Sequence, residues 1–302
     1  MRQALKHAAE AAFVSLGAAR AARALVRGRI LILAYHNIVP HGERLAGERS
    51  LHLRQKAFGA QLDLIALTHD VVPLADALQP DSIRAIRPRA VITWDDAYAG
   101  AVTAGVEEVA RRGMPATIFV APGFVGGRAY WWDDLAEVSQ DRLGEARRAV
   151  FLRELAGRDE AIRRTTAAPE GPSLPANARG ASESELLAAA RHPGITFGAH
   201  SWDHPSLTRL GNDDLTAELC RPLEWLRQRF ASTLPVLAYP YGLWNPAVAV
   251  AVAQAGYQAA LRIDGGWLPK RPSNPFTLPR LSVPAGLSPD GFALRLSGLL
   301  CR

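Results

Sequence analysis

The stretch Val91-Ile92-Thr93-Trp94-Asp95-Asp96-Ala97-Tyr98 is an apolar run that ends abruptly on two adjacent carboxylates. Its length and continuous apolarity predict a strand that is buried on both faces. Successive strand residues point to opposite faces, so Asp95 and Asp96 are expected to have different surroundings and different tasks. Taken alone, the pair also fits an ordinary acidic turn at a strand end.

Further strand-like runs occur along the chain, and helical patterns separate them. The other apolar runs of strand length lie at residues 29–36, 71–74, 116–120, 195–200, 236–239, 258–262 and 277–283. Helical patterns cover residues 58–68, 75–87, 101–112, 213–229 and 247–255. This alternation predicts a parallel sheet, either a closed barrel or a doubly wound sheet. In barrels the chemistry lies at the carboxyl ends of the strands, and polar residues follow several of these runs.

Composition sets limits on the class of protein. The chain has 302 residues, 48% of them hydrophobic and 21% charged, which suits one large globular domain. Two cysteines exclude a disulfide framework and a Cys-rich zinc site. The formal net charge is +6, but there is no Lys/Arg run with interleaved aromatic residues, so we expect no nucleic-acid partner.

Residues 1–28 form a separate basic segment that we predict to be helical. The apolar piece within it is too short to span a membrane, and Glu10 makes it a poor signal peptide. The helix either packs on the domain or makes peripheral contact with an anionic membrane surface. We therefore expect a cytoplasmic protein, which would be membrane-associated if the helix contacts a membrane surface.

Residues 29–302 are expected to form the main domain, with a helical and loop insertion at about 131–192 and a mobile surface loop at 169–180.

A pair of histidines follows the strand-like run at 195–200. His200 and His204 are four residues apart, and both imidazoles can reach one ion if the loop between them coils like a helical turn. Two imidazoles and one carboxylate are a familiar donor set for a divalent metal that keeps an open position for water. The Asp-Asp pair could supply the carboxylate. A lone His-x3-His also fits a structural pair, but the combination with the two aspartates favours a metal site.

A third motif, Tyr239-Pro240-Tyr241-Gly242, follows another strand-like run. It predicts a fixed backbone turn that can present an exposed amide N–H. Next to a metal, such an amide would stabilise an oxyanion; without one, it is an ordinary turn.

In this order, the three motifs resemble the polysaccharide deacetylase family (NodB homology, carbohydrate esterase family 4). The resemblance runs from about Ile30 to about Val283. It implies an α/β fold, a distorted (β/α)7 barrel, and metal-dependent removal of an acyl group from an N-acyl sugar. The implied partner is an N-acetylated glycan or a glycan precursor.

The resemblance also implies roles for individual residues. Asp95 resembles the general base, and the backbone amide of Tyr241 resembles the oxyanion donor. The metal triad would be Asp96, His200 and His204, holding usually zinc and sometimes cobalt or nickel. Candidates for contact with the sugar are Tyr239, Pro240, Trp202, Asp264 and Arg280.

Three departures from the family pattern affect the site. Ala97 stands where the family usually has glycine, and the third motif lacks the arginine that pairs with the base. From its position in a late strand-like stretch, Arg280 could replace that arginine as the partner of Asp95. No histidine follows His204, so the usual general acid is absent. His36 is one hypothesis for that acid, and a structural histidine at a strand end is the alternative.

Two other functions compete with deacetylation. The missing late histidine would suit a catalytically impaired, carbohydrate-binding member of the family. Other members hydrolyse cyclic amides, but these depart from the metal motif, so the presence of the triad favours the sugar substrate.

Overall fold

The computed structural model describes residues 2–79, 87–139, 144–166, 174–269 and 272–300. A parallel sheet in the order β10-β1-β5-β6-β7-β8-β9 forms its centre, and β4 pairs with the start of β5. The strands are β1 (Ile30–Tyr35), β2 (Asn37–Val39), β3 (His52–Arg54), β4 (Asp70–Val71), β5 (Arg89–Trp94), β6 (Ala116–Val120), β7 (Ile195–Ala199), β8 (Thr233–Ala238), β9 (Ala259–Leu261) and β10 (Leu281–Ser282).

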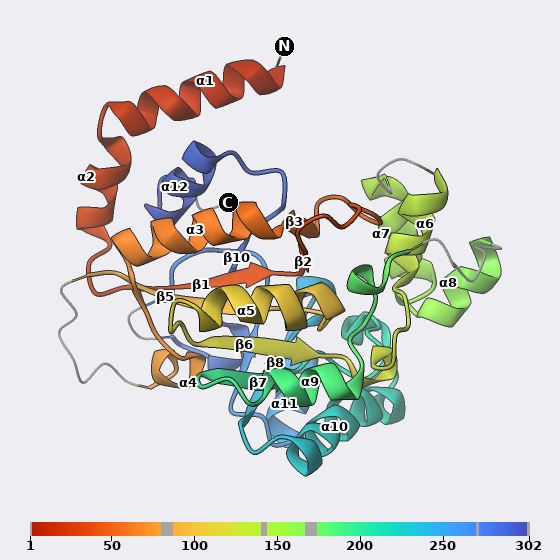
Figure 1. Cartoon of the computed structure of the whole chain (residues 1–302). Helices are drawn as coiled ribbons and strands as arrows, with labels where there is room; N and C mark the ends of the chain where they lie inside the picture. Colours follow the sequence, from red (N-terminus) through yellow and green to blue (C-terminus); the bar gives the residue numbers. More distant parts are fainter. Residues whose placement is uncertain (1, 80–86, 140–143, 167–173, 270–271, 301–302) are drawn as a thin grey trace.

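Helices surround this sheet. The α-helices are α1 (Arg2–Ser15), α2 (Ala18–Leu25), α3 (Gln55–Thr68), α4 (Leu74–Ala77), α5 (Val106–Ala110), α6 (Trp131–Ser139), α7 (Glu145–Glu154), α8 (Asp159–Thr166), α9 (Glu183–Ala189), α10 (Asn212–Arg229), α11 (Pro246–Gln254) and α12 (Pro289–Leu296). Shorter turns are η1 (Ala101–Gly105), η2 (Pro122–Phe124), η3 (Ala176–Ala178), η4 (Leu207–Arg209), η5 (Pro240–Gly242) and η6 (Pro275–Thr277). Figure 1 shows α3 and α12 on one side of the sheet, α10 and α11 on the other, and α6 to α8 at the end toward which the strands point.

The central strands that the apolar runs predicted are buried as expected, whereas the run at 71–74 gives only the short β4, which is not buried, and α4 begins at Leu74. Every residue of β1 and β6 is buried, and so are all residues of β5 except Arg89. Side chains on both faces of such strands pack against other elements, which explains why their sequences are continuously apolar rather than alternating.

The segment around β10 closes the sheet into a barrel. Leu278 makes a parallel bridge to Leu261 on β9, and three residues later Leu281 pairs with Leu33 on β1. The segment thus joins β9 to β1, and Arg280 lies between the two pairings. The result is the distorted barrel with surrounding helices that the resemblance implied.

The basic N-terminal segment forms two helices instead of one. Gly17 separates α1 from α2 with a φ of 77°, a left-handed conformation that ends a helix. α1 contacts α12, near the other end of the chain. Among the described residues, no helix is long and apolar enough to cross a membrane.

Two sequence expectations need correction. The helix expected at 75–87 is α4, which ends at Ala77, and residues 80–86 lie outside the described part. In the expected surface loop at 169–180, residues 167–173 also lie outside it, but the remainder is tied to the site. Ala99 N donates to Arg179 O (2.8 Å) and Ala181 N donates to Ala97 O (2.9 Å), so this part is fixed against the turn that follows β5.

Candidate metal and catalytic site

The site forms where the carboxyl ends of adjacent strands meet. Asp95 and Asp96 directly follow β5, His200 directly follows β7, and β6 lies between these two strands. Tyr241 lies in η5, which follows β8 on the other side of β7. Parallel strands end at one edge, so residues more than a hundred positions apart come together.

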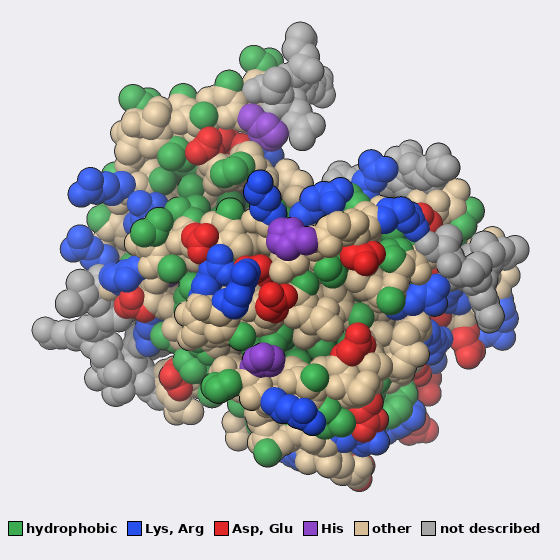
Figure 2. All heavy atoms as spheres, in the orientation of Figure 1, with side chains coloured by type: hydrophobic (Ala, Val, Ile, Leu, Met, Phe, Trp, Pro, Cys, Tyr) green, Lys and Arg blue, Asp and Glu red, His purple; other side chains and the backbone are tan. Residues whose placement is uncertain are grey.

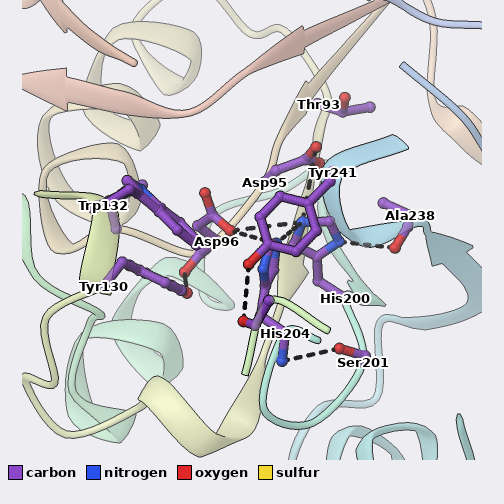
Figure 3. Close-up of polar contacts among 12 residues, drawn as sticks. Thr93, Asp95, Asp96, Tyr130, Trp132, His200, Ser201, His204, Ala238 and Tyr241 are labelled. Atoms are coloured by element: carbon purple, nitrogen blue, oxygen red, sulfur yellow. Dashed lines mark hydrogen bonds and ion pairs between the residues drawn. The ribbon is translucent and has the colours of Figure 1, made fainter. Parts of the chain in front are cut away.

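Asp96, His200 and His204 direct three potential ligand atoms at one point (Figure 3). Asp96 Oδ1 lies 3.5 Å from His200 Nε2 and 3.3 Å from His204 Nε2, and the two imidazole nitrogens are 3.1 Å apart. All three residues are buried, yet Asp96 Oδ1 accepts no hydrogen bond from any residue that the structure describes. A buried carboxylate oxygen without a donor is costly, and a cation between these atoms would remove that cost. The donor set therefore fits a divalent metal.

Burial keeps the two histidines in the neutral form that binds metal, and a hydrogen bond fixes the tautomer of His200. His200 Nδ1–H donates to Ala238 O (2.8 Å), which leaves Nε2 without a proton and orients the ring. Burial lowers the pKa of His200. Burial and the neighbouring His200 lower the pKa of His204 well below its usual range. Both imidazoles are therefore neutral near pH 7, as metal ligation requires.

The chain bends sharply to place these ligands. Of the described non-glycine residues, six have positive φ, and five of them lie in the three motifs: Asp96, Ala97, Ser201, His204 and Tyr241. Left-handed backbone is unfavourable for such residues and concentrates at functional sites. Ala97 stands where the family usually has glycine, and its side chain is buried, at 2% exposed. Its φ of 49° is a conformation that glycine adopts more easily than alanine.

Asp95 is held by Arg280 in a fully buried bidentate pair. Arg280 Nη1 donates to Asp95 Oδ1 and Nη2 to Asp95 Oδ2, each at 2.7 Å, and Nη1 also lies 3.2 Å from Thr93 Oγ1. Arg280 is 0% exposed. Burial opposes ionisation of Asp95, but Arg280 and the nearby His200 and His36 outweigh it and hold the pKa of Asp95 below its usual range. Asp95 is thus ionised at any working pH.

The neighbouring Asp96 has the opposite electrostatic environment. Burial, followed by the charges of Asp95 and Asp133, raises the pKa of Asp96 well above its usual value. The two adjacent carboxylates therefore differ, as their alternation predicted: Asp95 is neutralised by an arginine, whereas among the described residues Asp96 forms no salt bridge with Lys or Arg. A bound metal ion would supply a matching cation.

The turn at Tyr241 lies next to the metal ligands. Gly242 permits it, since a Cβ there would come within 2.2 Å of Ile263 Cγ2. The Tyr241 ring lies 4.6 Å from the His204 ring, and its hydroxyl accepts from Trp131 Nε1 (3.2 Å) and donates to Gly157 O (3.2 Å). These contacts fix the turn whose amide resembles the oxyanion donor.

Comparison with known proteins agrees with this geometry. A sequence model described as polysaccharide deacetylase matches residues 83–260, more than half of the chain. The chain belongs to the polysaccharide deacetylase family. It is accordingly a carbohydrate deacetylase, a hydrolase acting on carbon–nitrogen bonds.

Solved structures share the fold of this deacetylase at low sequence identity. The Streptococcus pyogenes deacetylase PplD, solved with acetate, is 16% identical over 89% of this chain and 98% of its own, with a TM-score of 0.62. IcaB from Ammonifex degensii is 16% identical over 90% of this chain and 96% of its own, with a TM-score of 0.61. The putative polysaccharide deacetylase BA0330 from Bacillus anthracis is 15% identical over 89% of this chain and 69% of its own, with a TM-score of 0.62.

The residues expected to contact sugar are not all placed to do so. Arg280 is buried against Asp95, and Tyr239 is buried with its hydroxyl donating to Phe276 O (2.8 Å), so both support the deacetylase fold from within. Pro240 is also buried. Trp202 is half-buried under Arg221, whose guanidinium lies 4.0 Å from the ring centroid. Asp264 is exposed and pairs with Arg262 at 2.7 Å.

Sequence reasoning missed the buried layer behind the ligands. Trp131 and Trp132 belong to this layer: they are 1% and 2% exposed, and the Trp132 ring lies 5.1 Å from that of His204. Tyr130 donates from its hydroxyl to Asp96 O (2.7 Å). The run of aromatic residues at 130–132 is the sequence signal for this layer, although it does not show which ring faces the site.

A cation from the insertion also reaches the site. Arg148 on α7 lies 5.6 Å from the Tyr241 ring centroid, and its charge acts to lower the pKa of both Asp96 and His204. No pattern in the sequence connects α7 with the ligands, because only the folding of the insertion brings them together.

Proposed function

We propose that this protein is a metal-dependent hydrolase that removes an N-acetyl, or another N-acyl, group from an amino sugar of a polysaccharide or glycan precursor. The observation that carries the proposal is the convergence of Asp96, His200 and His204 beside a second carboxylate that a buried arginine keeps ionised.

The site residues divide the work of hydrolysis among them. A divalent ion held by Asp96, His200 and His204, most simply zinc, with cobalt or nickel as alternatives, would polarise the acyl carbonyl and acidify the attacking water. Asp95 accepts the proton of that water, and the Tyr241 amide donates to the carbonyl oxygen as negative charge develops there. The amine then leaves with a proton supplied by a general acid.

The proposal is tested by measuring metal binding and turnover in the same protein. Zinc-loaded protein is expected to release acetate from N-acetylated oligosaccharides, and His200→Ala is expected to lose both zinc binding by calorimetry and acetate release. His192→Ala, at an exposed histidine of the same chain, serves as the matched control and should retain both. Zinc binding without acetate release would favour the carbohydrate-binding alternative, and full activity of His200→Ala would contradict the mechanism.

His36 is the strongest candidate for the general acid, since it directly follows β1, where Tyr35 O accepts from Asp95 N (2.9 Å), and it senses the charge of Asp95. Burial lowers its pKa to about 4, Asp95 opposes this shift, and Arg280, His200 and Arg148 add to it. Because His36 is neutral at pH 7, it can only pass on a proton that it has first received from the attacking water through Asp95.

We therefore expect His36→Ala to slow the release of a poorly leaving sugar amine by about a hundredfold, with less than about a tenfold effect on an activated amide. Steady-state kcat for the two substrates measures this difference. Equal losses on both substrates would show that His36 has a structural role.

A further inference from the structure

α1 packs on the domain with its charged side. Glu10 is 6% exposed, and its carboxylate accepts from Ser288 Oγ (2.6 Å) at the start of α12. His7 and Val14, on the same side of the helix, are half-buried. The side chains that attach α1 to the protein therefore include a buried acid.

The opposite side of α1 is apolar and faces solvent. Leu5, Ala9, Ala12, Phe13 and Leu16 follow the spacing i, i+4, i+7, i+8 and i+11, which places them on one face of a helix. Leu5 is 64%, Phe13 57% and Leu16 82% exposed, and Leu25 at the end of α2 is 86% exposed. A helix at the surface of a globular protein normally has the reverse orientation, with its apolar stripe toward the core. Packing on the domain therefore does not account for this face.

The charge exposed on this segment has one sign. Glu10 is the only acidic residue among residues 2–28, and it is buried. Lys6, Arg20 and Arg27 are exposed, and Lys6 Nζ also lies 3.7 Å from Glu10 Oε1. α1 and α2 lie at the edge of the molecule, away from the carboxyl ends of the strands (Figure 1), and Figure 2 shows hydrophobic and Lys/Arg side chains along this edge.

We propose that α1 and α2 dock on an anionic lipid bilayer. The apolar face of α1 would enter the boundary between headgroups and acyl chains, while Lys6, Arg20 and Arg27 contact the negative headgroups. Charge complementarity selects lipid over a second copy of the chain, because a second copy would bring the same cations against one another.

The proposal predicts selective, salt-sensitive vesicle binding by the full-length protein. We expect sedimentation with vesicles of phosphatidylcholine and phosphatidylglycerol, weakened by salt, and little binding to phosphatidylcholine alone. The triple variant Leu5→Ser, Phe13→Ser, Leu16→Ser is expected to lose about tenfold or more in affinity, since each side chain contributes apolar burial. Arg20→Gln with Arg27→Gln should lower affinity and reduce the salt dependence.

A matched triple variant removes exposed apolar side chains elsewhere. Leu67, Leu187 and Val250 are 79%, 41% and 56% exposed on α3, α9 and α11, so changing each to serine should leave vesicle binding unchanged. Thermal melting verifies folding of every variant independently of enzymatic activity. Equal binding to neutral vesicles, or unchanged binding by the α1 variant, would overturn the proposal. A third result would also overturn it: a wild-type protein that forms a dimer but does not bind lipid, with the dimer abolished in the α1 variant. That result would assign this face to a second copy of the chain.

Discussion

Asp95→Asn is expected to lower kcat for acetate release by about a hundred- to ten-thousand-fold, the usual contribution of a positioned general base. Asparagine keeps the shape of the side chain and still accepts one hydrogen bond from Arg280, but it leaves the buried guanidinium without a counter-charge, so thermal melting of the variant accompanies the kinetics. Asparagine has no basic carboxylate, so the proton of the attacking water has no acceptor at that place. Steady-state kinetics on an N-acetylated oligosaccharide, with the zinc content of each preparation, measures the effect.

The control for this variant is another aspartate in the motifs. Asp203 lies between the two histidines, but its side chain is 51% exposed and faces Arg128 at 3.7 Å instead of the ligand cluster. Asp203→Asn should leave kcat within a few-fold of the wild type. If Asp95→Asn binds zinc normally and retains full turnover, Asp95 is not the base.

The parts of the fold that the sequence predicted well are those buried on two faces. β5 and β7 have continuous apolar sequences and end on polar residues, so the strand ends and the meeting of Asp96 with His200 could be anticipated. The pairing of Arg280 with Asp95 was inferred from position alone, and the structure contains it because the segment before β10 closes the barrel.

The parts that could not be predicted depend on contacts between distant segments. Asp133 in the insertion bonds His52 Nε2 (2.8 Å) and the Tyr98 hydroxyl (2.6 Å), joining three elements through buried groups. Neither spacing nor periodicity relates these residues, and each one alone fits a surface position. The same holds for Gly180, which lies in a polar segment but bridges to Tyr98 in the fold.

Arg280→Met is expected to lower the free energy of unfolding by about 3–5 kcal/mol, the usual cost of leaving one member of a buried ion pair without its partner. Methionine fills similar volume without a donor, so Asp95 stays buried as an uncompensated carboxylate. Chemical denaturation near pH 7 measures the loss. Arg158→Met, which breaks the exposed pair with Asp214, should cost less than about 1 kcal/mol.

The double variant Asp95→Asn, Arg280→Met distinguishes loss of the pair from loss of packing. It removes both charges, so it should be more stable than Arg280→Met alone. Equal stability of the two variants would mean that the arginine acts by packing and not by neutralising Asp95.

The pH dependence of Arg280→Met follows from the same pair. With Arg280 present, the pKa of Asp95 is lower in the folded state than in the unfolded state. The pair therefore stabilises the protein fully at any pH above the unfolded-state pKa. This stabilisation is lost as the pH falls through the folded-state pKa. Without Arg280, the largest influence that lowers the pKa of Asp95 is lost while burial still raises it, so the carboxylate takes up a proton at a higher pH than in the wild type. The acid limb of kcat/KM should therefore move to higher pH in Arg280→Met and stay in place in Arg158→Met. An unchanged acid limb would show that Arg280 does not set the ionisation of Asp95.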